Sequence, residues 1–144
     1  EAIRKNLRRN VEKGKMSEAD MNATLGRITG TLKYEDFRDC DLVIEVILEN
    51  LEAKRQLFAT LDGICPPHTI LASNTSSLPI IEMATATKRP DRFIGLHFFN
   101  PVPVMQLVEV VRSLVSSDEV VAAGKQFAES LGKTAVMEAG AIRR

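Results

Sequence analysis

Two titratable side chains stand in an otherwise apolar stretch of the sequence. In "GLHFFNPVPVMQLVEVV", which runs from Gly95 to Val111, His97 is one of two histidines of the chain and Glu109 is the single carboxylate. A lone histidine in an apolar strand is more often a hydrogen-bonded core residue, and Glu109 could simply face water. A carboxylate on an adjacent strand, however, would fix the imidazole tautomer and stabilise its cation. Together the two residues indicate a general base and its orienting carboxylate.

Polar clusters follow three of the strands that the pattern predicts. Glu49 comes after "DLVIEVI", residues 73–77 ("SNTSS") come after "HTIL", and residues 97–101 end the strand that carries the histidine. In open α/β sheets ligands bind beyond the carboxyl ends of the strands, so we expect the three clusters to converge along one edge. Ser76 or Ser77 could instead only cap the helix that follows.

Two chemistries are open to a serine hydroxyl near such a pair. Ser76, His97 and Glu109 could perform nucleophilic hydrolysis, or His97 could remove a proton from a substrate hydroxyl while Ser76 positions the substrate. The sequence has no Gly-x-Ser-x-Gly turn, which exposes a nucleophile between a strand and a helix. We therefore rank the hydrolase well below proton abstraction.

Helical and extended patterns alternate along the chain. Helical spacing predicts a hairpin of two helices over residues 3–11 and 17–28, separated by Gly14, with Ser17 as the cap of the second. Further helices are predicted over 51–63, from Pro79, and over 117–131, and strands over 28–34, 41–47, 68–74, 92–99, 106–111 and 134–138. Strands and helices joined by short links predict an open α/β sheet with mainly parallel pairing.

Composition limits the possible functions. The chain has 144 residues, 44% of them hydrophobic, and 19 basic against 19 acidic side chains, which fits one domain and gives no net field to attract nucleic acid. No apolar run reaches the roughly twenty residues of a membrane span. Cys40 and Cys65 have neither metal-ligand spacing nor a disulfide framework, so we expect buried free thiols, a reducing compartment and no metal.

Three long motifs carry a resemblance to a known family. "DLVIEVILENLEAKRQLFATLD", "ILASNTSSLPI" and "RFIGLHFFNPVPVMQLVEVV" closely resemble, in order and spacing, the dinucleotide-binding domain of the 3-hydroxyacyl-CoA dehydrogenases, from about Ile3 to about Val136. The resemblance implies an incomplete Rossmann-type, doubly wound sheet with a helical hairpin insertion. It also implies NAD as cofactor, oxidation of 3-hydroxyacyl-CoA to 3-oxoacyl-CoA in fatty acid β-oxidation or related acyl-CoA metabolism, and a cytoplasmic or mitochondrial matrix location.

The resemblance also implies roles for single residues. His97 matches the family base, Glu109 its partner carboxylate, and Ser76 the serine that contacts both the substrate oxygen and the nicotinamide side. Among the cofactor contacts, Asn100 matches an asparagine near the nicotinamide, Glu49 and Lys54 match contacts to the nicotinamide ribose half, and Asn74 is a weaker match.

The basic first helix carries the last of these implied roles. Its residues Arg4, Lys5, Arg8 and Arg9 resemble the helical tail over which such enzymes place CoA, although a solvated helix face explains them nearly as well.

The sequence also departs from the family pattern. Gly-x-Gly-x-x-Gly, which holds the pyrophosphate, does not occur, and no "PGF-I-NR" segment follows the last predicted strand. We expect residues 1–144 to be a partial domain, cut at both ends and without the C-terminal helical domain. The isolated 144 residues should bind NAD poorly, be inactive and self-associate. We expect a homo-oligomer, formed through the missing C-terminal domain or through an open sheet edge. The alternative is a non-catalytic binding or structural remnant.

Overall fold

The computed structural model describes residues 1–140 and divides into two compact units. The first unit comprises Glu1–Lys33, and the second begins at Tyr34. Among the described residues, no helix is both long and apolar enough to cross a membrane.

The first unit is the predicted helical hairpin. It consists of α1 (Ala2–Glu12) and α2 (Glu18–Gly26), and Gly14 makes the turn between them with a φ of +68°, a conformation that glycine adopts without strain. The Ser17 hydroxyl caps α2 by accepting a hydrogen bond from the backbone N–H of Asp20 at 3.0 Å. The hairpin and its cap are thus confirmed, and α2 ends two residues before the predicted end.

The strand predicted over residues 28–34 does not form. The segment is irregular, and a short 3₁₀ helix, η1 (Tyr34–Phe37), begins where the strand was expected to end. Leu32 is fully exposed, so the alternation of apolar residues in this segment buries nothing. A strand is stable only when it pairs with a neighbour, and the described part of the chain pairs none with these residues.

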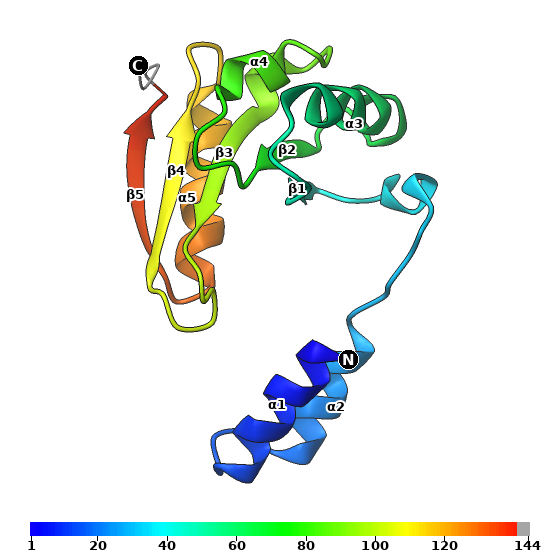
Figure 1. Ribbon diagram of the computed structural model, residues 1–144, viewed down its shortest axis with the longest axis vertical. Helices are drawn as coiled ribbons and strands as arrows, with labels where there is room; N and C mark the ends of the chain where they lie inside the picture. The colour runs from blue at the N-terminus through cyan, green and yellow to red at the C-terminus, as the bar shows by residue number, and fades with distance from the viewer. Residues whose placement is uncertain (141–144) are drawn as a thin grey trace. The chain divides into compact units, whose positions relative to one another are not determined.

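The second unit is an open five-stranded sheet with helices on both faces (Figure 1). The strands are β1 (Leu42–Glu45), β2 (Ile70–Ser73), β3 (Phe93–Phe98), β4 (Leu107–Arg112) and β5 (Thr134–Ala139), in that spatial order. The helices are α3 (Leu51–Ile64), α4 (Ile80–Ala84), the 3₁₀ turn η2 (Pro90–Arg92) and α5 (Asp118–Ser130). The predicted α/β sheet of Rossmann type is confirmed.

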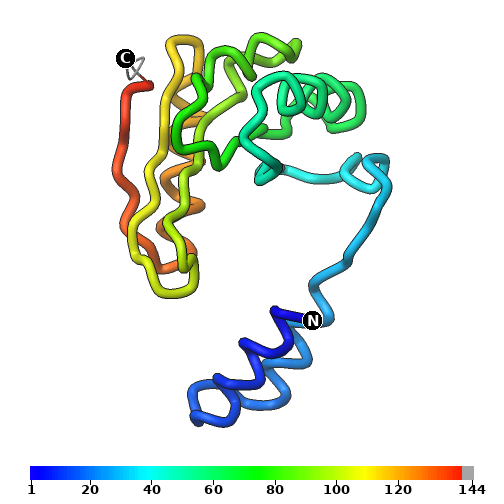
Figure 2. The backbone as a smooth tube through the Cα atoms, viewed as in Figure 1, coloured from blue at the N-terminus to red at the C-terminus, as the bar shows by residue number. Residues whose placement is uncertain are grey.

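One strand pair departs from parallel pairing. β1, β2 and β3 pair in parallel, as do β4 and β5, but β3 and β4 are antiparallel. The segment between β3 and β4 contains no helix, and a parallel pair needs a crossover of a dozen or more residues. The chain therefore reverses directly, as the loop between the two strands shows in Figure 2.

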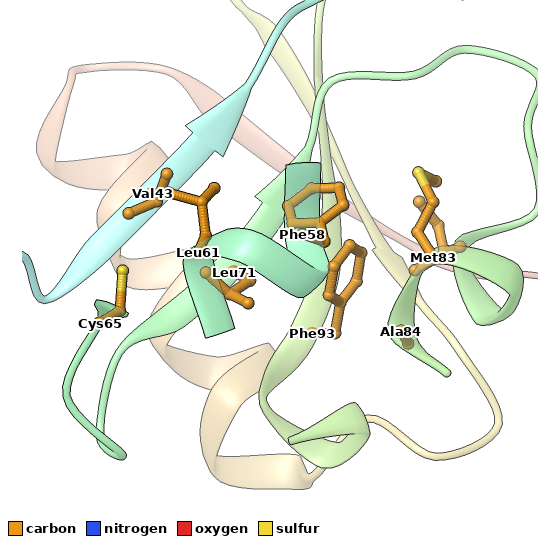
Figure 3. Packing of buried hydrophobic residues seen from close by; sticks show 9 residues of the cluster. Val43, Phe58, Leu61, Cys65, Leu71, Met83, Ala84 and Phe93 are labelled. Atoms are coloured by element: carbon orange, nitrogen blue, oxygen red, sulfur yellow. The ribbon is translucent and has the colours of Figure 1, made fainter. Parts of the chain in front are cut away.

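Alternate residues of the strands fill two separate cores. Val43, Leu71 and Phe93 point to the face that α3 and α4 cover, where the rings of Phe58 and Phe93 meet edge to face with centroids 4.5 Å apart (Figure 3). Ala72 and Ile94, one position further along, belong to the core under α5. The alternation follows from the two-residue period of a strand.

The same alternation fixes the face of the predicted base. Counting by twos from Phe93, Gly95 and His97 lie on the face that carries α4. A Cβ atom at Gly95 would lie 2.8 Å from Cβ of Val111 and 3.0 Å from Cδ1 of Ile80, which belongs to α4. The absence of a side chain at Gly95 thus lets α4 approach the sheet just before the histidine.

Both cysteines are free thiols, as predicted. Cys65 is buried at the end of α3, and burial raises the pKa of its thiol. Cys40 is half-buried against the same core.

Candidate functional site

His97 and Glu109 form a cross-strand pair. They are directly opposite in the antiparallel β3–β4 ladder, and Nδ1 of His97 lies 2.8 Å from Oε2 of Glu109. Their side chains are 17% and 19% exposed, so the pair is largely shielded but still reachable. An ionised carboxylate can only accept a hydrogen bond, so Nδ1 carries the proton and Nε2 is the nitrogen that can take one from a substrate. The predicted pairing on adjacent strands is confirmed.

Neighbouring groups hold the histidine strand in place. The ring of Phe99 lies 4.5 Å from that of His97, centroid to centroid. The backbone N–H of Phe98 donates to Oδ1 of Asn74 at 2.8 Å, and the N–H of Asn74 donates to the carbonyl of Glu45 at 3.0 Å. Asn74, predicted as a cofactor contact, therefore ties the carboxyl ends of β1, β2 and β3 together.

A cleft of about 340 Å³ lies beside the pair. Its walls are residues 75–81, which lead into and form part of α4, and on the sheet side Glu109, Val111, Ser113 and residues 138–140. Ser76 is exposed and lines this cleft together with Glu109, so the structure brings these two predicted residues to one site. Asn100 is exposed two residues beyond the end of β3.

The "SNTSS" segment is shaped by its threonine. The Thr75 hydroxyl oxygen accepts hydrogen bonds from the backbone N–H groups of Leu78 at 3.0 Å and Ser77 at 3.3 Å. The residue that caps α4 is Pro79, with no side-chain hydrogen bond to the helix. The alternative in which Ser76 or Ser77 caps the helix is therefore wrong.

A buried charge network joins the ends of β1 and β2. Lys54 is 1% exposed, and its Nζ lies 2.6 Å from Oε1 of Glu45, 3.0 Å from Oε1 of Glu49 and 3.2 Å from the carbonyl oxygen of Ile47. The other oxygen of Glu45, Oε2, accepts the hydroxyl of Ser73 at 2.6 Å. Sequence reasoning missed Glu45, although a carboxylate in the apolar run "DLVIEVI" is a signal that could have identified it.

Glu49 is the solvent-facing member of this network. Its side chain is 47% exposed, and its Oε2 accepts the hydroxyl of Thr75 at 2.7 Å. Partial burial opposes ionisation, but the hydrogen bonds from Thr75 and Lys54 and the charge of Lys54 outweigh it and lower the pKa of Glu49. The result is a fixed carboxylate at the carboxyl edge of the parallel strands.

The predicted CoA residues lie in the hairpin unit. Arg4, Lys5 and Arg9 are exposed on α1, and Nη1 of Arg8 pairs with Oε1 of Glu18 at 3.2 Å within the hairpin. A role for these residues at the site on the sheet is a prediction.

Comparison with known proteins identifies the family. Residues 1–140 match the family model described as "3-hydroxyacyl-CoA dehydrogenase, NAD binding domain". The chain belongs to this family, in agreement with the sheet, the strand-end clusters and the histidine–glutamate pair.

Individual relatives agree with this assignment. A probable 3-hydroxybutyryl-CoA dehydrogenase of Bacillus subtilis is 54% identical over 134 residues, which are 93% of this chain and 47% of the relative. The crystal structure of (S)-3-hydroxybutyryl-CoA dehydrogenase PaaH1 from Ralstonia eutropha is similar with a TM-score of 0.92 at 44% identity, over 95% of this chain and 48% of that one. A 3-hydroxybutyryl-CoA dehydrogenase structure from Escherichia coli K12 gives a TM-score of 0.94 at 42% identity, over 96% and 29% of the two chains. The chain spans about half the length of the curated relatives it matches.

Proposed function

We propose that the protein carrying this chain oxidises 3-hydroxyacyl-CoA to 3-oxoacyl-CoA with NAD. The observation that carries the proposal is the His97–Glu109 pair at the edge where the parallel strands end, next to a cleft that Ser76 lines. Relatives that share these segments are named 3-hydroxybutyryl-CoA dehydrogenases, which supports a 3-hydroxyacyl thioester as the substrate class.

His97 acts as the general base in this proposal. Its Nε2 takes the proton from the 3-hydroxyl group, and Glu109 stabilises the imidazolium that forms. NAD, when bound, accepts the hydride from C3 of the substrate. Ser76 hydrogen-bonds the substrate oxygen and keeps it close to the base. Partial burial of the pair strengthens the attraction between His97 and Glu109, because the local dielectric constant is below that of water.

The described residues fit the nicotinamide ribose half of the cofactor. Glu49 offers a half-exposed carboxylate that can accept hydrogen bonds from ribose hydroxyls, and it stands where ligands bind in open α/β sheets. We assign Lys54, Asn100 and Asn74 to the same half. The 144 residues contain no Gly-x-Gly-x-x-Gly turn, so we propose that this stretch alone binds NAD weakly.

Three wider features belong to the same proposal. Arg4, Lys5 and Arg8 would pair with the phosphates of CoA. All three lie on α1, which carries a further basic residue, Arg9, in its last turn. We also propose a homo-oligomer, and a reducing compartment such as the cytoplasm or the mitochondrial matrix, which the free thiols of Cys40 and Cys65 support.

An assay of the full-length native protein tests the proposal. NADH consumption with acetoacetyl-CoA, followed by absorbance, should be rapid and should require the CoA thioester. Binding of NADH without turnover of acetoacetyl-CoA or its longer-chain homologues would favour the non-catalytic alternative. Hydrolysis of the thioester without NADH consumption would favour the Ser76, His97 and Glu109 hydrolase.

A further inference from the structure

We infer that Phe99 is a positioning residue for the proposed base, because its ring fixes the orientation of the His97 imidazole and shields it from water. The inference rests on the proposed function, since it concerns how His97 takes a proton from the substrate hydroxyl. Phe99 touches neither cofactor nor reacting atoms in this scheme and acts through His97.

The hydrogen bond to Glu109 alone does not fix the imidazole. It joins Nδ1 of His97 to Oε2 of Glu109 and so holds a single point of the ring. The χ2 torsion of a histidine is broad, so the ring can still turn about that point. Any such turning moves Nε2, the nitrogen that accepts the proton.

Phe99 supplies a second contact on the ring. The centroids of the two rings lie 4.5 Å apart, and their planes are inclined by 50° to each other. This distance is at the short end of the range for interacting aromatic pairs. Glu109 thus holds the imidazole by its Nδ1 atom, and Phe99 restricts the turning of the ring.

The same contact shields the base. Phe99 is half-buried and packs against an imidazole that is itself only 17% exposed. Exclusion of water strengthens the attraction between the imidazolium of His97 and the carboxylate of Glu109. Phe99 carries no hydrogen-bonding side-chain group, so it leaves Nε2 free for the substrate hydroxyl.

The backbone is held on both sides of Phe99. Before it, the N–H of Phe98 donates to Oδ1 of Asn74 at 2.8 Å, and the Phe98 side chain packs against the core under α5. After it, the carbonyl of Pro101 accepts the N–H of Val104 at 2.9 Å and closes a turn. The ring of Phe99 is therefore carried by a segment that is fixed before any ligand arrives.

Phe99→Leu in the full-length native protein tests the inference. With acetoacetyl-CoA and NADH, kcat should fall about tenfold, because a small displacement of a reacting group is costly. The KM for acetoacetyl-CoA and the dissociation constant of NADH should not change. Phe99→Tyr keeps the ring and should recover most of the lost kcat.

Phe127→Leu is the matched control for this substitution. Phe127 is also half-buried, but it lies on α5 and packs against the core on the opposite face of the sheet from His97. Its loss should leave kcat unchanged. An equal fall of kcat in both leucine variants would overturn the inference, because it would indicate a general structural defect.

Chemical modification measures the shielding without turnover. Diethyl pyrocarbonate acylates unprotonated imidazole nitrogens, and mass spectrometry of the peptides gives a separate rate for each histidine. In the ligand-free protein, Phe99→Leu should speed the modification of His97 several-fold. His68, whose side chain is 60% exposed, is an internal reference and should react at the same rate in both proteins. Equal His97 rates in wild type and Phe99→Leu would overturn the inference.

A double-mutant cycle shows whether Phe99 acts through His97. If it does, Phe99→Leu should lower kcat no further in a protein that already carries His97→Gln. Additive losses would overturn the inference. A higher KM with unchanged kcat would overturn it as well, because Phe99 would then bind the substrate directly.

A second variant covers the case in which Phe99→Leu does not fold, as judged by thermal unfolding. Phe99→Met replaces the ring by a flexible apolar side chain, and the same changes in kcat and in the modification rate of His97 are expected. Unchanged values in a folded Phe99→Met protein would overturn the inference. Failure of the wild-type protein to turn over acetoacetyl-CoA would overturn the proposed function itself, whereas the modification rates would still test the contact between Phe99 and His97.

Discussion

The imidazole of His97 and the carboxylate of Glu109 lie opposite each other across the antiparallel β3–β4 pair, 2.8 Å apart between Nδ1 and Oε2. Both side chains rise from the same face of the sheet, so the contact requires no long side-chain reach. A hydrogen bond from Nδ1–H to the carboxylate selects one tautomer and leaves Nε2 able to accept a proton.

Replacement of the base should abolish most of the activity. In the full-length protein, His97→Gln should lower kcat about a hundred- to ten-thousandfold, the usual contribution of general-base catalysis. His68→Gln is the matched control, because the side chain of His68 is 60% exposed and pairs with Asp41, the residue before β1. Steady-state rates with acetoacetyl-CoA and NADH measure both. Equal rates for wild type and His97→Gln would exclude the proposed role.

Ser76 should never become acylated. It positions the substrate in our proposal, and the turn that carries it lacks the glycines of a nucleophile elbow. After treatment with an activated ester, the intact mass of the wild-type protein should match that of Ser76→Ala. An added acyl mass that disappears in Ser76→Ala would point to the hydrolase instead.

Loss of Arg89 should destabilise the sheet unit strongly. Its guanidinium is almost fully buried and pairs with the carboxylate of Asp62 at 2.6 Å. It also donates hydrogen bonds to four carbonyl groups at the end of α3 and before β2, which belong to Asp62, Cys65, Pro66 and Thr69. Arg89→Ala leaves the largely shielded carboxylate of Asp62 without its guanidinium partner and should cost about 3 to 5 kcal/mol. The exposed Arg38→Ala should change the free energy of unfolding by less than about 0.5 kcal/mol. Urea denaturation compares the two, and similar losses would contradict this account.

The lowered pKa of Glu49 makes part of the stability depend on pH. At neutral pH the carboxylate is ionised in both states, and its native hydrogen bonds contribute fully. As the pH falls below the ordinary glutamate value of about 4.3, the unfolded chain takes up the proton first, so this contribution declines until the folded carboxyl group is protonated too. The difference in unfolding free energy between wild type and Glu49→Gln should therefore shrink as the pH falls. A difference that grows towards acid pH would contradict the sign of the shift.

Gly95 should tolerate no side chain. Gly95→Ala would place its Cβ atom 2.8 Å from Cβ of Val111, so β3, β4 or α4 must shift, at a cost of about 1 to 3 kcal/mol. Gly63→Ala is the matched control in α3, where an added Cβ meets no atom within 4 Å, and alanine there should stabilise the helix by up to about 1 kcal/mol. Thermal unfolding of both variants measures the contrast. A Gly95→Ala protein as stable as wild type would show that α4 packs less tightly than described.

The sequence predicted the elements that are held by strong local signals. The strand around His97, the helix capped at Ser117 and the pairing of His97 with Glu109 all follow from apolar periodicity, capping residues and the need of a shielded imidazole for a partner. The false strand at residues 28–34 had the same local alternation but no strand to pair with. Strand formation depends on distant residues that a local pattern does not contain.

The buried network escaped prediction for a related reason. The resemblance assigned Lys54 to the cofactor, and no local pattern indicated a buried ion pair, because lysine is almost never fully buried unless paired. Lys54 is buried because β1, α3 and β2 come together in the fold. Its partner Glu45 is nine residues from it in the sequence, and Ser73 is 28 residues from Glu45. Sequence spacing alone does not bring these groups together.

The direct reversal between β3 and β4 places His97 and Glu109 in register with each other through the strand ladder, and not through the loop that joins the strands. A shift of one residue in the pairing would turn Glu109 to the α5 face, and a shift of two would move it about 7 Å along the strand. The ladder hydrogen bonds oppose both shifts in register. Burial of residues such as Leu96 and Val110 in the core on the opposite face opposes them as well. The spacing of His97 and Glu109 is thus set by the paired strands themselves and not by the residues that join them.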